Sequence, residues 1–303
     1  MKKIMSSMAI IIAVLLASFA VSACETTKST DEKYFTFEYV EATDSYVVAA
    51  SELELPKTVF IPAEYEGKPV TAVKEGGFSG ENCFALTDVV VRQQASFEIG
   101  VGAFAGLKNL RSVDFNASAV TVGANAFENC IGLKEINFKA PVEKLTVASY
   151  AFKNAGFEAV ELEAEEVYVS AYAFANCASV KALVINGLVE FDPSAVNGCT
   201  ALASMTVTGN YYSEGGNVYA TVGGAKVLVR YAPAAPATSF APAECQIGAY
   251  AFRNAVNLTL IDLSNVTYVG EYAFLSSSVT QFEGSFDASA WDASWAVGSS
   301  YLA

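Results

Sequence analysis

The sequence predicts a repeat solenoid rich in β-strands and joined by short helical turns, and three observations support this prediction. A unit such as "VGANAFENCIGLKEINF", from Val122 to Phe138, has near copies that begin at Ile99, Val169 and Ile247. Most copies of its Ala-Phe pair lie 22 to 26 residues apart, a spacing typical of solenoids. A unit of this length cannot bury its own apolar face, so the units are stable only when they stack.

Residues 1–23 have the order of a secretory signal peptide, in which a basic start precedes an apolar run from Met8 to Val21. The run is short for a membrane span, which needs about 20 residues. "VSAC", ending at Cys24, resembles the lipobox of bacterial lipoproteins, which implies a lipidated cysteine that holds the protein on a membrane. The alternative is an ordinary signal peptide followed by a chance cysteine. Residues 24–33 are interpreted as the lipidated cysteine and a polar tether.

Residues 34–73 are predicted to form a β-rich N-terminal cap, because they are rich in strand-forming residues and lack the repeated Phe. Residues 74–208 hold the first repeats. In each copy a strand with one buried face follows the Ala-Phe pair, and a second short strand precedes it. The Phe side chains are predicted to form one column inside the solenoid: Phe78, Phe104, Phe127, Phe152, Phe174, Phe252 and Phe274, with Val196 in one position.

The 56-residue interval between Val196 and Phe252 is interpreted as an insertion over residues 209–246. Within it, "NVYATVGGAKVLVRY" has two alternating runs around a Gly-Gly pair, which predicts a hairpin, and a Pro-Ala connector follows. Repeats resume over residues 247–282. Residues 283–303, which contain both Trp residues, are predicted to form a C-terminal cap or tail.

The unit "AF-x-N-C-x-x-L-x-x-I-x-F", with its preceding strand, resembles the BspA-like, or Treponema-type, leucine-rich repeat of bacterial surface proteins. The resemblance runs from about Ile61 to Phe282, and "YEGKPVTAV" is similar to a segment common in that family. It implies a right-handed solenoid of the leucine-rich-repeat type. It also implies adhesion-type roles, such as attachment to host matrix, to other bacteria or to proteins.

The composition excludes several classes of function. With 32 acidic and 18 basic residues the net charge is -14, which disfavours nucleic-acid partners and a basic membrane-binding face. The chain contains no histidine, so Ser-His-Asp and Cys-His catalysis and histidine metal sites are excluded. We therefore expect no enzymatic activity, no cofactor and no metal. A carboxylate-only enzyme stays open, and the acidic run "ELEAEEVYV" suits a solvated edge better than a calcium site.

Two surfaces are candidates for binding. Polar residues flank the central aliphatic residue of each strand that follows a Phe, and in stacked repeats they would form ladders on one extended face. The alternative for these residues is simple solvation. The candidate ladder residues are Ser112, Asp114, Glu135, Asn137 and Glu161.

The second candidate surface is a tyrosine column just before the Ala-Phe pairs, formed by Tyr150, Tyr172, Tyr250 and Tyr272. Aromatic rings with polar tips suit sugar stacking or protein contacts. The alternative is that each ring covers the backbone of the neighbouring repeat.

Cysteines recur at one repeat position, three residues after the Phe, which predicts small buried side chains rather than a disulfide set. A disulfide between Cys177 and Cys199 stays open. The sequence as a whole predicts a non-catalytic, adhesin-like protein that is lipid-anchored in the bacterial outer membrane and surface-exposed. Its expected partners are proteins or polysaccharides on host or neighbouring cells. The alternatives are an envelope scaffold and a glycan-capture accessory lipoprotein.

Overall fold

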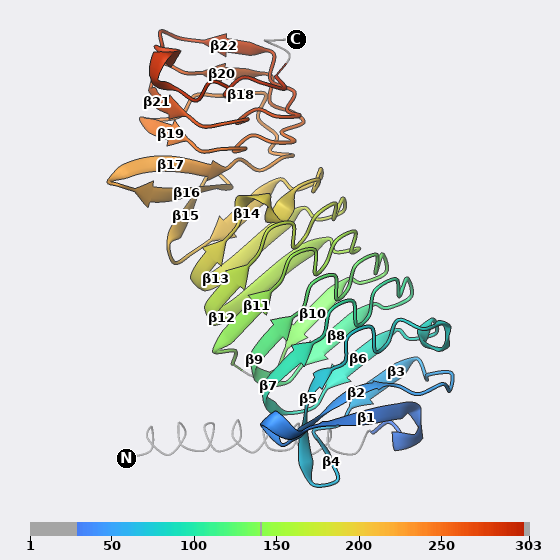
Figure 1. The fold of residues 1–303 in the computed structure, drawn as a ribbon. Helices are drawn as coiled ribbons and strands as arrows, with labels where there is room; N and C mark the ends of the chain where they lie inside the picture. The colour runs from blue at the N-terminus through green and yellow to red at the C-terminus, as the bar shows by residue number, and fades with distance from the viewer. Residues whose placement is uncertain (1–28, 140, 300–303) are drawn as a thin grey trace, which may run out of the picture.

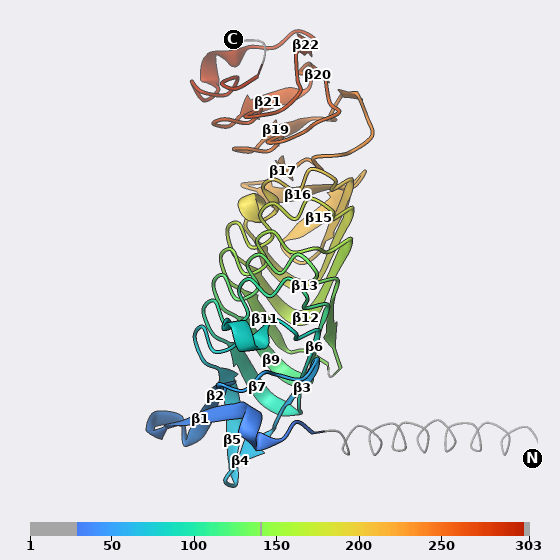
Figure 2. The same ribbon diagram turned by 90° about the vertical axis from the view of Figure 1, so that its right-hand side faces the viewer.

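The computed structural model describes residues 29–139 and 141–299. They form a β-solenoid of about ten turns, which confirms the predicted fold class. Figures 1 and 2 show the coils stacked into one elongated body, with the first strands at one end and the last strands at the other. No helix within these residues is long and apolar enough to cross a membrane. The predicted signal peptide and Cys24 lie outside the described residues.

One sheet runs through the strands that precede each Phe and ends with a strand that follows Val196. It begins with an antiparallel hairpin and continues with parallel strands, because each coil returns to the same edge before it starts the next strand. The strands are β1 (Phe35–Val40), β2 (Ser45–Ala50), β5 (Lys68–Val73), β7 (Gln94–Ile99), β9 (Ala117–Val122), β11 (Lys144–Val147), β12 (Ala159–Val169), β13 (Ala182–Phe191) and β14 (Ser204–Val207), with β4 (Glu64–Tyr65) paired to β5.

A second sheet runs through the strands that follow each Phe, here called main strands. Its order is β10-β8-β6-β3, all parallel. These strands are β3 (Thr58–Ile61), β6 (Asp88–Val91), β8 (Ser112–Phe115) and β10 (Glu135–Phe138). In β12 and in β13 one long strand covers both positions, and their pairing has a register shift between Glu163 and Glu166. The main-strand face therefore continues through the first halves of β12 and β13 and through β14.

The predicted phenylalanine column is confirmed. Rings of successive coils from Phe78 to Phe174 stack nearly parallel, with centroids 5.1 to 5.4 Å apart. Phe252 and Phe274 continue the stack at 5.1 Å. This spacing follows from the strand separation of about 4.8 Å, because each ring is carried by its own coil. All seven side chains are buried, so the column forms the centre of the core.

The hairpin and Pro-Ala connector do not loop out of the solenoid but form part of it. The strands are β15 (Tyr211–Glu214), β16 (Asn217–Val222), β17 (Ala225–Arg230), β18 (Ser239–Phe240), β19 (Cys245–Ile247), β20 (Leu260–Asp262), β21 (Val266–Val269) and β22 (Gln281–Glu283). β17 pairs in parallel with β19, and β18 with β20. Tyr231 takes the position of the missing Phe, 5.1 Å from Phe252, and its N–H donates to the Ala251 carbonyl.

The remaining regular elements are short 3-10 helices: η1 (Glu32–Tyr34), η2 (Glu41–Thr43), η3 (Glu81–Cys83), η4 (Pro193–Val196) and η5 (Ala288–Ala290). Most Ala-Phe segments are turns, held because each Phe N–H donates to the Ala carbonyl of the next coil, as from Phe127 to Ala151 at 2.7 Å. In the coil that departs from the Ala-Phe pattern, the Asp192 carboxylate accepts from the Ser194 N–H and starts η4.

The repeated cysteines are buried, as predicted. Each thiol donates to the Phe carbonyl of the preceding coil at 3.1 Å, as from Cys130 to Phe104, Cys177 to Phe152 and Cys199 to Phe174. Burial raises the pKa of the Cys130 thiol to about 12, which keeps it protonated as a donor. Cys177 and Cys199 both carry free thiols in this structure.

Candidate binding surface

The predicted polar ladder is present on the main strands of the N-terminal coils. Ser112 on β8 lies in register with Glu135 on β10, and Asp114 with Asn137. The Ser112 hydroxyl donates to Asp88 at 2.6 Å, and the Asn137 amide donates to Asp114 at 2.8 Å. These bonds join neighbouring coils across the outer face and hold the polar side chains in rows.

The ladder is interrupted between β10 and β12. β10 is the last strand of the main-strand sheet, whereas β12 pairs with β11 and β13. The predicted ladder, in which Glu161 would follow Asn137, is therefore interrupted at this junction. The rows resume beyond it, where Glu161 lies in register with Val184.

Two changes of length in the sequence account for the interruption. Phe127 and Leu133 are six positions apart, whereas the equivalent Phe152 and Phe157 are five positions apart, so the coil is shortened just before β12. The shortened turn runs against the coil before it, because a Cβ on Gly156 would lie 2.0 Å from the Ile131 carbonyl oxygen.

The second change is at the corner that follows β10. Phe138 and Leu145 are seven positions apart, whereas the equivalent Phe115 and Val120 are five positions apart. This longer corner contains Pro141, which has no N–H to give to a sheet. Pairing resumes directly after it, where the Glu165 N–H donates to the Val142 carbonyl at 3.0 Å.

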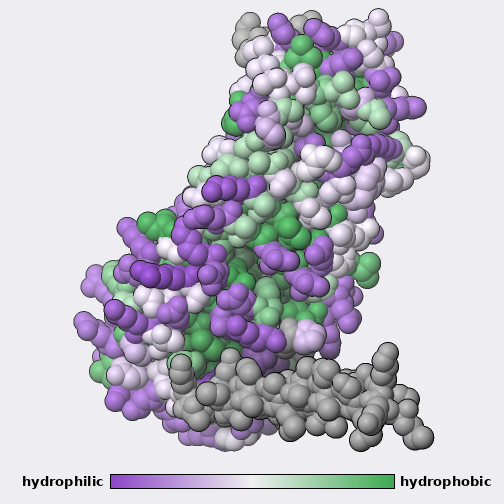
Figure 3. Space-filling model, turned by 180° about the vertical axis from the view of Figure 1, so that it is seen from behind, coloured by the Kyte–Doolittle hydropathy of each residue, from purple (hydrophilic) through white to green (hydrophobic). Residues whose placement is uncertain are grey.

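The two separated strands border an open cleft, here called the β10–β12 cleft. Its volume is about 650 Å³, within the range of ligand sites, and a smaller cavity of about 250 Å³ shares part of its lining. Ile136 and Phe138 are half-buried at its base, although Val113 and Phe115, their partners in register on β8, are fully buried. Figure 3, the view from behind, shows hydrophobic residues exposed at mid-length of the molecule between hydrophilic ones.

The walls of the cleft carry an excess of acidic groups. Glu161, Glu163 and Glu165 are exposed on alternate positions of β12. The two nearby lysines are engaged: Lys134 donates to the Gly156 carbonyl at 2.6 Å, and Lys139 lies 3.5 Å from Asp114. Within residues 29–139 and 141–299, no three His, Cys, Asp or Glu side chains converge in a way that could hold a metal ion.

The tyrosine column consists of two stacked pairs on the turns. Tyr150 and Tyr172 stack with centroids 5.1 Å apart and planes at 4°, and Tyr250 and Tyr272 stack at 5.6 Å and 21°. Each ring therefore packs on its neighbour's ring and stays partly exposed, with 36% of Tyr150 accessible. The Lys153 ammonium lies 5.6 Å from the centroid of Tyr150, a cation–π distance.

All four tyrosines have a left-handed backbone, with φ between 49° and 61°. The same turn position holds Gly102 and Asn125 in earlier coils, and these are the residue types that tolerate this conformation. A tyrosine at such a position is strained by about 1–2 kcal/mol. The chain therefore keeps the exposed rings at a cost in stability.

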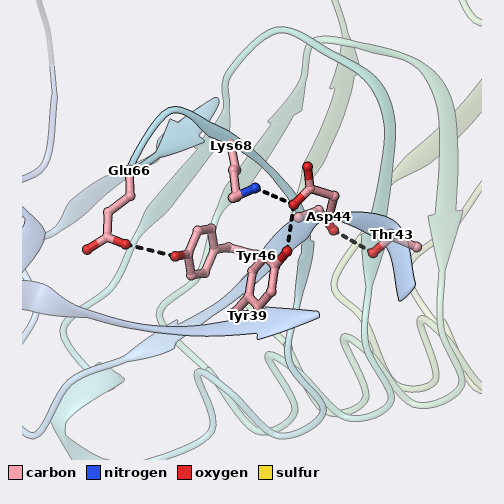
Figure 4. Close-up of polar contacts among 7 residues, drawn as sticks. Tyr39, Thr43, Asp44, Tyr46, Glu66 and Lys68 are labelled. Atoms are coloured by element: carbon pink, nitrogen blue, oxygen red, sulfur yellow. Dashed lines mark hydrogen bonds and ion pairs between the residues drawn. The ribbon is translucent and has the colours of Figure 1, made fainter. Parts of the chain in front are cut away.

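A polar cluster at the N-terminal end joins the β1–β2 and β4–β5 hairpins (Figure 4). The Tyr39 hydroxyl donates to Asp44 at 2.6 Å, Lys68 forms an ion pair with Asp44, and the Tyr46 hydroxyl donates to Glu66 at 2.9 Å. Hydrogen bonds from Lys68 and Tyr39 lower the pKa of the Asp44 carboxyl. These contacts fasten the first hairpin over the end of the solenoid.

Sequence reasoning missed this cluster and the cleft. The cluster extends into aromatic packing, where Phe37 stacks on Tyr65 at 3.8 Å and Tyr46 meets Tyr65 edge-on at 5.0 Å. Alternating aromatic residues in "YFTFEY" were its signal in the sequence. The signal for the cleft was the unequal spacing on the two sides of Phe138, together with Pro141.

The fold and its open repeat face define a protein of the leucine-rich-repeat class. The family described as BspA type leucine rich repeat region (6 copies) matches residues 71–203, 146–222 and 240–289. These ranges cover more than half of the chain, and the protein belongs to this family. No curated protein matches the sequence.

Solved structures share the fold. A leucine rich cell surface protein from Faecalibacterium prausnitzii is 18% identical with a TM-score of 0.57, and the match covers 85% of this chain and 76% of that one. A leucine-rich repeat protein from Bacteroides ovatus is 18% identical with a TM-score of 0.54, over 86% of this chain and 76% of that one. At these identities the likeness shows the fold alone.

Proposed function

We propose that this protein is a non-catalytic, adhesin-like binding protein of the bacterial cell surface, anchored by lipid at Cys24, and that its main-strand face recognises a protein. The observation that carries the proposal is the β10–β12 cleft, which leaves the core side chains Ile136 and Phe138 accessible between polar rows. Accessible apolar groups with a polar rim are typical of recognition sites. The surface location is supported by the likeness to the Faecalibacterium prausnitzii cell surface protein.

A solenoid suits this task because its coils hold the face rigidly. Side chains on paired strands lose little further conformational entropy when a ligand binds. Asn137 and Asp114 are already fixed by their mutual hydrogen bond. The net charge of -14 favours a partner with basic groups.

The proposal is tested by titrating the purified protein over immobilised host matrix proteins and polysaccharides. We expect saturable binding to a protein, weakened about tenfold by the charge reversal Glu161→Lys. The matched control is Glu98→Lys, because Glu98 is also an exposed glutamate on a strand but lies on β7, outside the main-strand face. The proposal is wrong if no protein binds, or if both variants bind like the wild type.

The anchor and the location have their own test. Cys24→Ala should release the protein from the membrane fraction, because without the cysteine no acyl chain is attached to the protein. In the wild type, protease added to intact cells should remove the solenoid. Retention of the Cys24→Ala protein on membranes contradicts the anchor, and full protection from protease favours the alternative of an inward-facing envelope scaffold.

A second candidate is glycan capture by the tyrosine column. The strained backbone of the four tyrosines and the stacking of Tyr150 on Tyr172 favour it, because flat exposed rings suit sugar faces. Polysaccharide should then quench tyrosine fluorescence, and the double variant Tyr150→Ala, Tyr172→Ala should lose this response. Unchanged binding by the double variant would discard the glycan site.

A further inference from the structure

We propose that the β10–β12 cleft binds an extended, basic segment of a partner protein, which inserts as a strand between β10 and β12. The inference rests on the proposed function, since it names the chemistry of the ligand at the same face. It follows from the backbone at the two walls, from the length of the opening and from the charges around it.

The two walls present unpaired strand edges. On β10, the N–H groups of Glu135 and Lys139 donate toward β8, to Arg111 and Phe115. Backbone N–H and C=O groups alternate sides along a strand. Because those of Glu135 and Asn137 face β8, the N–H and C=O groups of Ile136 point into the cleft. A main chain in extended conformation is the ligand whose own N–H and C=O groups match such an edge.

The opposite wall has the same property. The Lys181 N–H donates to the Glu158 carbonyl at 2.9 Å, so Glu158 faces β13. By the same alternation, the backbone groups of Ala159 and Glu161 face the cleft. β10 and β12 thus offer two parallel edges with no strand of the described residues between them, within the part of the face that runs from β3 to β14.

The length of the opening sets the length of the ligand. At one end pairing resumes at Val142 and Glu165, and at the other end Lys134 closes on Gly156. Between these ends β10 offers four residues. At about 3.3 Å per residue the opening is about 13 Å long, so about four residues of the ligand pair with it.

The chemistry of the lining selects the side chains. Ile136, Phe138 and Val142 supply an apolar base, which suits every second residue of an extended strand. Exposed Glu161 and Glu163 border the opening, and they suit Lys or Arg at the alternate positions. A glycan or nucleic acid lacks a regular row of peptide N–H groups and fits the two edges less well.

The probe for the experiment is a fluorescently labelled peptide, acetyl-Lys-Val-Lys-Val-Lys-Val-amide, titrated with the intact protein and followed by anisotropy. We expect saturable binding that weakens with added salt. Methylation of alternate peptide nitrogens should weaken binding about tenfold or more, because it removes the donors needed for pairing. The peptide with Glu in place of Lys should not bind.

Variants locate the site. Glu161→Lys combined with Glu163→Lys should weaken the Lys-Val peptide about tenfold. Both side chains are exposed, so the fold should be kept, and Glu98→Lys serves as the matched control. Equal affinity for the methylated and unmethylated peptides overturns strand insertion. Wild-type affinity in the double variant overturns the location.

Two further outcomes separate this inference from the proposed function. Binding to matrix proteins that responds to Glu161→Lys, with no binding of the Lys-Val peptide, overturns strand insertion and leaves the proposed function standing. Binding of the peptide at the cleft, without binding to any matrix protein, overturns the proposed function and leaves strand insertion standing. A dimer of this chain that excludes the peptide would assign the cleft to a second copy and overturn the proposal.

Discussion

The junction between β8 and β10 and the junction between β10 and β12 are built from the same repeat, yet one is closed and the other is open. At the closed junction four residue pairs lie in register from Glu135↔Ser112 to Phe138↔Phe115. At the open junction the main strands do not pair. One residue fewer before β12 and two more after β10 make the difference.

The opening is confined to the strand layer. Beneath it, Phe127 and Phe152 stack at 5.3 Å and 6°, and the Phe127 N–H still donates to the Ala151 carbonyl. The column and the turns therefore hold the two coils together while the outer strands separate. A solenoid can thus acquire a cleft through changes in corner length alone, without loss of its core.

The largest expected effect distinguishes the two junctions by their buried Phe residues. Phe115→Ala should destabilise the protein by about 3–5 kcal/mol, as for a fully buried ring. Phe138→Ala, at the position in register on the open side, should cost roughly half as much or less, because Phe138 is only partly buried. Denaturant unfolding of both variants measures the difference. Equal losses would mean that the cleft is closed in solution.

A smaller effect is expected at the close approach between coils. Gly156→Ala would place a Cβ 2.0 Å from the Ile131 carbonyl oxygen, and we expect a loss of about 1–3 kcal/mol. The matched control is Gly132→Ala at the closed junction, where the Cβ would lie 2.4 Å from the Lys108 oxygen. Both should lower stability in denaturant melts, but only Gly156→Ala should change binding of the Lys-Val peptide. The same binding change in both variants would contradict a local role of this contact.

The closed parts of the solenoid could be predicted because each coil repeats the same physical requirement. An Ala-Phe pair with a strand on each side specified the column, and the position of Ser112 relative to Glu135 specified the ladder. The coil that contains Tyr231 could not be predicted from the Ala-Phe pattern, because Arg230 stands where other coils have Ala. The Arg230 side chain is buried and donates to the Tyr250 carbonyl at 2.9 Å. The repeat pattern does not predict this contact.

The cleft could not be predicted from the ladder residues themselves. Asn137 and Glu161 occupy equivalent positions in their units, and their equivalence implied neighbouring places in one ladder. Whether two strands pair depends on the lengths of the segments on both sides, which shift the strand ends relative to each other. The left-handed backbone of the tyrosines could not be predicted either, because tyrosine replaces the Gly and Asn that indicate this conformation in other coils.

The tyrosine stack also distinguishes the junctions, since it begins at Tyr150 on the far side of the opening and Asn125 takes its place on the near side. Tyr150→Asn should change stability by less than about 1 kcal/mol, because relief of backbone strain offsets the lost stacking. Tyr150→Ala loses the stacking without this relief and should be less stable than Tyr150→Asn by roughly 0.5–1 kcal/mol. Thermal melts of both variants measure the difference, and an Ala variant as stable as the Asn variant would mean that the backbone is unstrained.

The smallest effect concerns the N-terminal hairpin, which closes its end of the solenoid by side-chain contacts. The pKa of Asp44 is lowered from 3.8 by hydrogen bonds from Lys68 and Tyr39. The stabilisation that the ionised Asp44 gives to the folded hairpin is therefore present above pH 3.8. It is lost as the pH falls through the lower pKa of Asp44 in the folded state. Proteolysis of the hairpin should accelerate below about pH 4 in the wild type, measured with an acid protease. Asp44→Asn should be cut faster at pH 5 and should show a weaker dependence on pH, whereas an unchanged pH dependence would exclude Asp44 as the group responsible.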